Sequence, residues 1–132
     1  MNIYALSSGR GPSGIAIVRI SGKDTLKVCK NLTKLKDINA NEVNYCQFYD
    51  PKNDKVIDQE ALLFCFPWPN SYTGDDLAEF QIHGSNAVIN ALLKALSEQD
   101  NCRLAEPGEF TKIAFQNDKI DLLKAPPLTF LT

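Results

Sequence analysis

The chain has 132 residues and a formal net charge of −2, and 44% of its residues are hydrophobic and 23% charged. This length fits one domain, and the composition is that of a globular protein with enough apolar residues for a core. The slightly acidic balance gives no support for a nucleic-acid-binding surface. No apolar run is long enough to span a bilayer, and the N-terminus lacks a secretion signal, so we expect a cytoplasmic protein.

Cysteine and histidine usage limits the metal and redox chemistry. The four cysteines, Cys29, Cys46, Cys65 and Cys102, are widely spaced and form no Cys-x-x-Cys pair, so the pattern predicts neither a zinc site nor a redox motif. Buried, reduced thiols are the simplest interpretation. His83 is the only histidine, and it cannot build a multi-histidine metal site. Its place beside a turn is more typical of a structural residue than of a catalytic one.

The N-terminal part predicts two strands and a helix. Residues 3–6 form a short apolar run, and residues 7–14 form a loop rich in glycine, serine and proline. This loop is either an anion cradle or a plain turn, but it has neither the P-loop ending nor the dinucleotide fingerprint. Residues 15–20 are rich in β-branched side chains and apolar on both faces, which predicts a strand buried on both sides. A helix is expected to begin at Ser21 or Gly22 and to run through Leu32.

Arg19 is anomalous in this strand because it shares a face with Ile15 and Ile17. An unpaired guanidinium on an apolar face is costly. Arg19 therefore either pairs with a carboxylate of the protein or lies at a pocket and meets an acceptor on a ligand.

The middle of the chain predicts an antiparallel hairpin. Residues 43–49 and 56–66 read as strands, and residues 50–55 carry turn chemistry. Residues 62–66 are apolar throughout, which places the end of the second strand centrally in the sheet. Pro67 and Pro69 end that strand.

Residues 69–84 combine a turn, a short strand and the start of a helix. Along the strand Ala78, Phe80 and Ile82 point one way, and Leu77, Glu79 and Gln81 point the other. Glu79 is either a solvated strand charge or an anchor for a small polar ligand, since it is fixed on a rigid element beside a turn and a helix N-terminus.

The C-terminal part predicts further helices. Ser85 and Asn86 are a plausible N-cap for an amphipathic helix that ends at residues 100–101. An extended segment at residues 102–105 and a helix at residues 109–116 follow, and residues 117–122 read as a turn with a new helical start. The helices alternate with strands that include a hairpin. We therefore predict an α+β fold with a mixed or antiparallel sheet and two to three helices.

Pattern alone reveals no catalytic or metal constellation. Asp75 and Asp76 are typical of turn and strand-start polarity. Lys119 lies in a polar turn, where solvent exposure is the simplest interpretation.

Four segments nevertheless form a specific combination. They are residues 9–22, residues 69–76 with Glu79 and residues 83–84, residues 105–111 with residues 114–115, and residues 117–122. In this order and spacing they resemble the N-terminal domain of the tRNA-modification GTPase family MnmE, also called TrmE. The resemblance covers almost the whole chain and divides it into a family-type domain, residues 1–125, and a tail, residues 126–132.

The resemblance implies a folate-binding and homodimerisation module. The family domain is an α+β unit similar to half of a lobe of the glycine-cleavage T-protein, and its dimer holds 5-formyltetrahydrofolate or a related tetrahydrofolate near the interface. The full family protein adds a helical domain and a GTPase domain that uses GTP, potassium and magnesium. It modifies the wobble uridine of tRNA with the flavoprotein partner MnmG. The resemblance gives no expectation that this part of the protein binds nucleic acid directly.

The family's folate contacts fall on Arg19, Glu79 and Lys119, and all three are of the expected residue type. A carboxylate such as Glu79 can accept both donors of an amino-pyrimidine edge, and the two cations can bind carbonyl or carboxylate oxygens. Arg10 and the loop around it are weaker candidates for closing over the ligand or crossing the dimer interface.

The sequence departs from the family pattern in two places, of which the first is a small change in a turn and the second is the more important. Asp75 stands where the family usually has glutamate, and Pro126 and Pro127 replace a helix that proline cannot continue. The GTPase motifs are absent, so we expect a truncated or frame-shifted product, or an isolated domain, that does not hydrolyse GTP alone. The alternatives are a structural dimerisation domain without folate binding and, ranked last, a folate-dependent aminomethyltransferase-like enzyme, for which the chain is too short.

Overall fold

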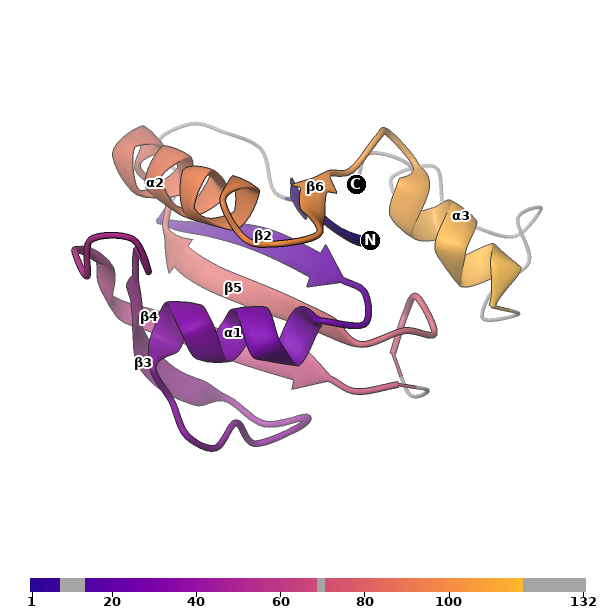
Figure 1. Ribbon diagram of the computed structural model, residues 1–132, viewed down its shortest axis with the longest axis horizontal. Helices are drawn as coiled ribbons and strands as arrows, with labels where there is room; N and C mark the ends of the chain where they lie inside the picture. Colours follow the sequence, from indigo (N-terminus) through magenta and orange to yellow (C-terminus); the bar gives the residue numbers. More distant parts are fainter. Residues whose placement is uncertain (8–13, 69–70, 118–132) are drawn as a thin grey trace.

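The computed structural model describes residues 1–7, 14–68 and 71–117 and shows one mixed sheet with three helices in that part of the chain (Figure 1). The elements are β1 (Asn2–Leu6), β2 (Ile15–Ser21), α1 (Thr25–Thr33), β3 (Asn44–Tyr49), β4 (Val56–Phe66), β5 (Leu77–His83), α2 (Asn86–Ser97), β6 (Cys102–Leu104) and α3 (Glu109–Gln116). The strands lie in the order β3-β4-β5-β2-β1-β6.

Neighbouring strands are antiparallel except β1 and β6, which are parallel. The predicted α+β class, the hairpin of β3 and β4, and the inner position of β4 are confirmed. Among the described residues, no helix is long and apolar enough to cross a membrane.

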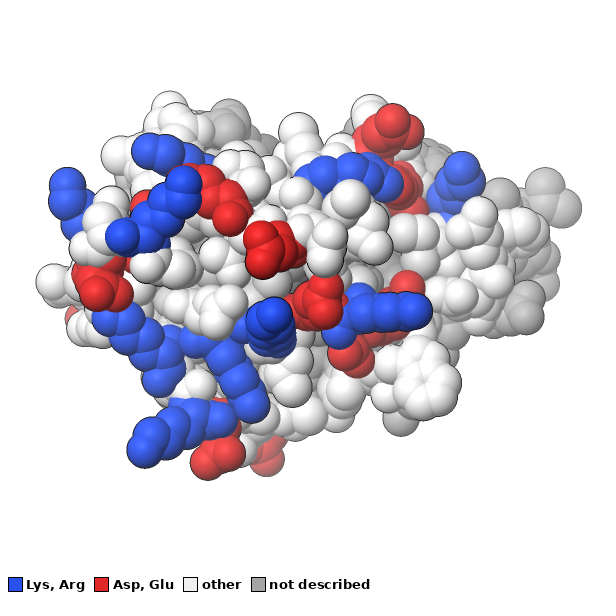
Figure 2. All heavy atoms as spheres, viewed as in Figure 1, with Lys and Arg blue, Asp and Glu red and all other residues white. Residues whose placement is uncertain are grey.

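The main core lies between the sheet and the helices α1 and α2, which cover the same face of the sheet (Figure 1). β2 contributes Ala16, Val18 and Ile20, and β5 contributes Phe80, which meets Phe48 of β3 edge to face with ring centroids 5.1 Å apart. The helices add the apolar stripes that their spacing predicts: Val28, Cys29, Leu32, Ile89, Leu92, Ala95 and Leu96. The outer surface on this side carries acidic and basic side chains interspersed, as is typical of a solvated face (Figure 2).

The opposite face of the sheet is covered at one end by α3, where Phe110 packs with Ile3 and Leu77. Beyond α3, Ile15 is 58% exposed and Tyr45 is 81% exposed. The prediction that the strand at residues 15–20 is buried on both faces is therefore wrong at its N-terminal end. This half-covered face, beyond α3, is called the open face below.

The structure also corrects two helix boundaries. α1 begins at Thr25 rather than at Ser21 or Gly22, because Ser21 still belongs to β2 and Gly22 has φ of +145°. α2 begins as predicted, with Ser85 Oγ accepting from the Val88 N–H at 3.2 Å, but it ends at Ser97. The predictions for residues 8–13, for the segment after residue 117 and for the tail at residues 126–132 lie outside the described residues.

Gly22 is required by a close approach between two segments. A Cβ atom at this position would lie 2.2 Å from Asn2 Oδ1 and 2.8 Å from the Asn2 Cα atom, so backbone would have to move. We expect Gly22→Ala to lower the free energy of unfolding by about 2 kcal/mol, from strain at this φ and from overpacking.

Gly14→Ala is the matched control, because a Cβ at Gly14 would meet no atom within 4 Å. It should change the stability by less than about 0.5 kcal/mol. Chemical denaturation of both variants measures the difference, and equal stabilities would show that the Asn2 contact does not restrict position 22.

Candidate functional site

The pairing of β2 with β5 brings two of the predicted site residues together. The two strands form an antiparallel ladder that runs from Ile15 opposite His83 to Ser21 opposite Leu77, and Arg19 lies directly opposite Glu79. Side chains of directly opposite residues lie on the same face of a sheet and in reach of one another. The alternation predicted for β5 is confirmed, since Phe80 is fully buried on the helix side and Glu79 lies on the open face.

Arg19 and Glu79 form a partly buried ion pair. Arg19 Nε donates to Glu79 Oε1 at 2.9 Å, with side-chain exposures of 36% and 18%. Within the described residues this is the hydrogen bond that joins the two side chains, and it uses one oxygen of the carboxylate. Of the two partners that the sequence left open for Arg19, the structure shows the protein carboxylate.

The four central strands place the pair in a row across the open face. Ala5 of β1 lies opposite Arg19, and Phe64 of β4 lies opposite Glu79, so the order is Ala5, Arg19, Glu79, Phe64. A small side chain thus flanks the cation, and a half-buried aromatic ring flanks the carboxylate. This row combines charge, hydrogen-bonding capacity and a flat apolar flank on rigid strands.

The turn before β5 is fixed by buried hydroxyl groups. Ser21 Oγ lies 2.7 Å from Thr73 Oγ1 and donates to the Asp76 carbonyl at 2.8 Å. Asn117 Nδ2, just after α3, donates to the Thr73 carbonyl at 2.8 Å. Thr73 is completely buried. These bonds tie the turn to the end of β2 and to α3, and so they hold the start of β5 in register.

Lys119, the third predicted contact, lies outside the described residues, as does Arg10. The structure therefore brings together Arg19 and Glu79, and the roles of all three residues in ligand binding stay predictions. Among the described residues no three metal-ligating side chains lie together.

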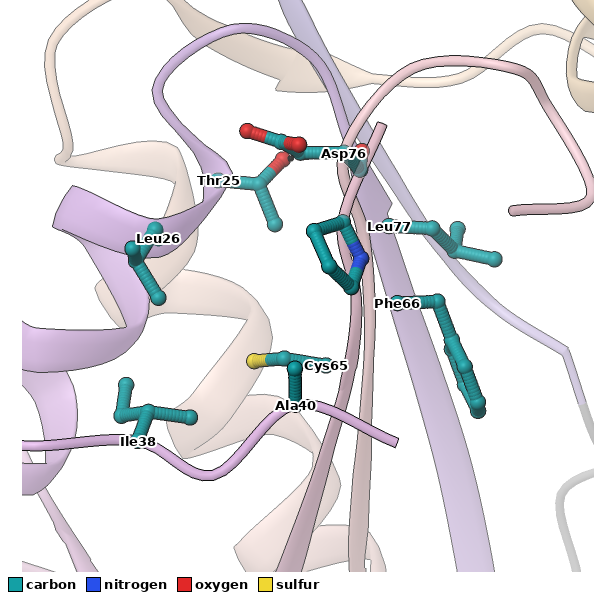
Figure 3. A pocket seen from close by; sticks show the side chains of 9 residues that line it. Thr25, Leu26, Ile38, Ala40, Cys65, Phe66, Asp76 and Leu77 are labelled. Carbon is teal, nitrogen blue, oxygen red and sulfur yellow. Dashed lines mark hydrogen bonds between the residues drawn. The ribbon is translucent and has the colours of Figure 1, made fainter. Parts of the chain in front are cut away.

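A separate hollow of about 100 Å³ lies on the helix side of the sheet, between α1 and the end of β4 (Figure 3). Its lining is largely apolar, including Leu26, Ile38 and Phe66, and the Cys65 thiol points into it. The interaction between the Cys29 and Cys65 thiols lowers the pKa of Cys65 and, together with burial, raises the pKa of Cys29. The hollow includes neither Arg19 nor Glu79, so it does not match the charges of the predicted ligand.

The sequence did not reveal one further cluster, in which Asp58 binds His83. Asp58 Oδ1 lies 2.8 Å from His83 Nδ1, and Asp58 Oδ2 accepts from the His83 backbone N–H at 2.8 Å. The Asp58 side chain is 3% exposed and that of His83 is 59% exposed. Asp58 stands in the polar first half of β4, beside Gln59 and Glu60, and nothing in the sequence linked it to His83, 25 residues away.

The fold and the Arg19–Glu79 row define an α+β domain with a polar pair on the sheet face opposite α1 and α2. Comparison with known proteins assigns this domain to a family. Residues 2–119 match the family model described as "GTP-binding protein TrmE N-terminus". The chain belongs to this family.

Similar curated proteins carry consistent names. The chain is 54% identical over 131 residues to "tRNA modification GTPase MnmE" of Pelagibacter ubique. The matched region is 99% of the chain and 29% of that protein. It is 42% identical over 135 residues to "tRNA modification GTPase gtpbp3, mitochondrial" of Dictyostelium discoideum. Here the matched region is 98% of the chain and 26% of that protein. The chain thus spans less than a third of the length of these relatives.

The strength of the ion pair can be measured by a double-mutant cycle with Arg19→Gln and Glu79→Gln. We expect a coupling free energy of about 0.5–1 kcal/mol, because both side chains are only partly buried. The matched control is the more exposed pair of Lys34 Nζ and Asp54 Oδ1, 3.0 Å apart, for which we expect about 0.3 kcal/mol. Zero coupling between Arg19 and Glu79 by chemical denaturation would contradict a formed pair in solution.

Proposed function

We propose that this domain binds a reduced folate, 5-formyltetrahydrofolate or a related tetrahydrofolate, on its open face and dimerises through that face. The observation that carries the proposal is the Arg19–Glu79 pair, fixed by the β2–β5 register on the side of the sheet that α1 and α2 leave uncovered. Family membership supports the proposal, since the predicted folate contacts include these two residues.

The chemistry of the pair fits the amino-pyrimidine edge of a pterin. Glu79 uses Oε1 for Arg19, and among the described residues no side chain is hydrogen-bonded to its second oxygen, which can accept from a ligand donor. Rotation of Arg19 would free both oxygens for two parallel N–H donors, which a carboxylate accepts bidentately. The guanidinium then meets a carbonyl or carboxylate oxygen of the ligand. Phe64, opposite Glu79, offers an aromatic flank for a flat ring. Lys119 would supply a further cation.

The open face also supports dimerisation. Tyr45 and Ile15 are large and exposed there, and Leu62 and Phe64 of β4 are only half-buried. A second copy of the domain would cover these apolar side chains and would enclose the row at Arg19 and Glu79.

The alternative is a structural dimerisation domain that does not bind folate. It is favoured by one observation, namely that Arg19 and Glu79 already neutralise one another in the structure. Ligand binding must then offset the loss of that bond, whereas a purely structural domain retains it.

The wider role is a proposal as well. We infer that the domain serves a cytoplasmic tRNA-modification GTPase that acts on the wobble uridine with the flavoprotein MnmG. The support is that relatives of which this chain spans 29% and 26% are named tRNA modification GTPases. The GTPase chemistry, with GTP, potassium and magnesium, belongs to the remainder of such a protein.

The folate proposal predicts saturable heat in calorimetry when 5-formyltetrahydrofolate is added to the domain. Glu79→Gln and Arg19→Gln should each weaken binding by about tenfold or more, because hydrogen bonds to charged groups contribute roughly 1.5–3 kcal/mol. Glu42→Gln is the control, since Glu42 is exposed and lies outside the row. No heat with the unaltered domain would instead support the structural alternative.

The dimer proposal predicts twice the monomer mass in light scattering. Tyr45→Lys together with Ile15→Lys should shift the sample to monomer, because each places a charge in the apolar part of the open face. A monomeric unaltered domain at high concentration would contradict dimerisation through this face, and circular dichroism of the double variant checks that its fold is retained.

A further inference from the structure

The Asp58–His83 cluster arises where β4 leaves regular pairing. The register between β3 and β4 shifts beyond Cys46, so that Phe48 lies opposite Asp58. Here the Asp58 carboxylate, rather than a backbone carbonyl of β4, accepts the last N–H group of β5, that of His83. Asp58 Oδ1 also accepts the Glu60 N–H at 3.1 Å. Two backbone N–H groups and the Nδ1 atom of the imidazole ring therefore converge on a single buried carboxylate.

This arrangement assigns the tautomer of the ring. A buried ionised carboxylate that already accepts two backbone N–H groups can only accept from the imidazole, so Nδ1 carries a hydrogen. In the neutral ring the lone pair then lies on Nε2, the nitrogen that Asp58 does not hold.

The exposure of the two partners argues against a purely structural pair. Burying a carboxylate is costly, and Asp58 is 3% exposed. The ring that it orients is 59% exposed and gains little packing energy from being held. Fixing a solvent-facing imidazole by a carboxylate on Nδ1 is the device that proteins use to present Nε2 to a ligand.

A hollow of about 190 Å³ adjoins this ring at the end of β5. Its lining includes Ile15 and Leu62, which are apolar, and Glu60, Gln81 and His83, which are polar. Glu60 and the lone pair of His83 are acceptors, and no lysine or arginine is among the described residues that line the hollow. The hollow therefore suits a donor-rich cation and disfavours an anion.

We propose that this hollow is a second ligand site, which binds a small molecule with a primary ammonium group. His83 Nε2, oriented by Asp58, accepts one N–H of that group, the Glu60 carboxylate neutralises its charge, and Ile15 and Leu62 contact its apolar part. Glu79 and His83 are four residues apart on β5, about 13 Å, so the hollow does not include the Arg19–Glu79 pair and the proposal does not depend on folate binding. A dimer formed through the open face would enclose this hollow too, since Ile15 and Leu62 belong to the apolar part of that face.

The single histidine allows a direct test by nitrogen-15 NMR of the ring. In the ligand-free domain, above the pH at which the ring loses its charge, Nδ1 should carry the hydrogen and Nε2 should not. Methylammonium, the probe, should shift the Nε2 signal saturably, and acetate should not. Glu60→Gln should weaken the methylammonium response several-fold, whereas Glu42→Gln, an exposed carboxylate outside the hollow, should leave it unchanged.

A neutral ring protonated at Nε2 would overturn the proposal, as would equal responses to methylammonium and acetate or no saturable response to methylammonium. Asp58→Asn should reduce the fraction of the Nδ1–H tautomer. Asp58 is buried, so the Asp58→Asn change can impair folding. The Glu60→Gln variant changes an exposed side chain and therefore tests the proposal independently.

Discussion

The antiparallel ladder between β2 and β5 is the constraint on which the rest of the domain depends. Its register places Val18 opposite Phe80 on the helix side, where both are fully buried, and Arg19 opposite Glu79 on the open face. Because side chains alternate along a strand, a slip of one residue in either strand would bury a charge and expose part of the core. The core and the polar pair therefore select the same register.

This register gives the two faces of the sheet different side chains, apolar on one face and partly charged on the other. The helix side supplies the stability, since α1 and α2 bury apolar side chains against it. The open face keeps a charged row and exposed apolar residues such as Tyr45, and, within the part of the chain that the structure describes, α3 covers one end of this side of the sheet. The Arg19 and Glu79 side chains thus project from strands whose positions are determined by packing on the other side, and this keeps the two strands rigid.

The sequence was sufficient where the signal was local. The period-2 pattern of β5 predicted which face Glu79 shares, and the anomaly of Arg19 in an apolar strand predicted a partner for it. It failed where tertiary contacts decide: the exposure of Ile15 depends on where α3 lies, and the start of α1 depends on the contact between Gly22 and Asn2. Asp58 and His83 meet beside a register shift between β3 and β4, and no pattern in the sequence indicates that shift.

The central claim is that the row around Arg19 and Glu79 on the open face is the ligand-binding surface of the domain. Chemical-shift mapping with 5-formyltetrahydrofolate on the isotope-labelled domain tests it most directly. The account predicts that the largest changes fall on open-face residues of neighbouring strands, namely Ile17, Arg19, Phe64 and Glu79. Changes centred on the apolar hollow at Cys65, or no changes at all, would contradict it.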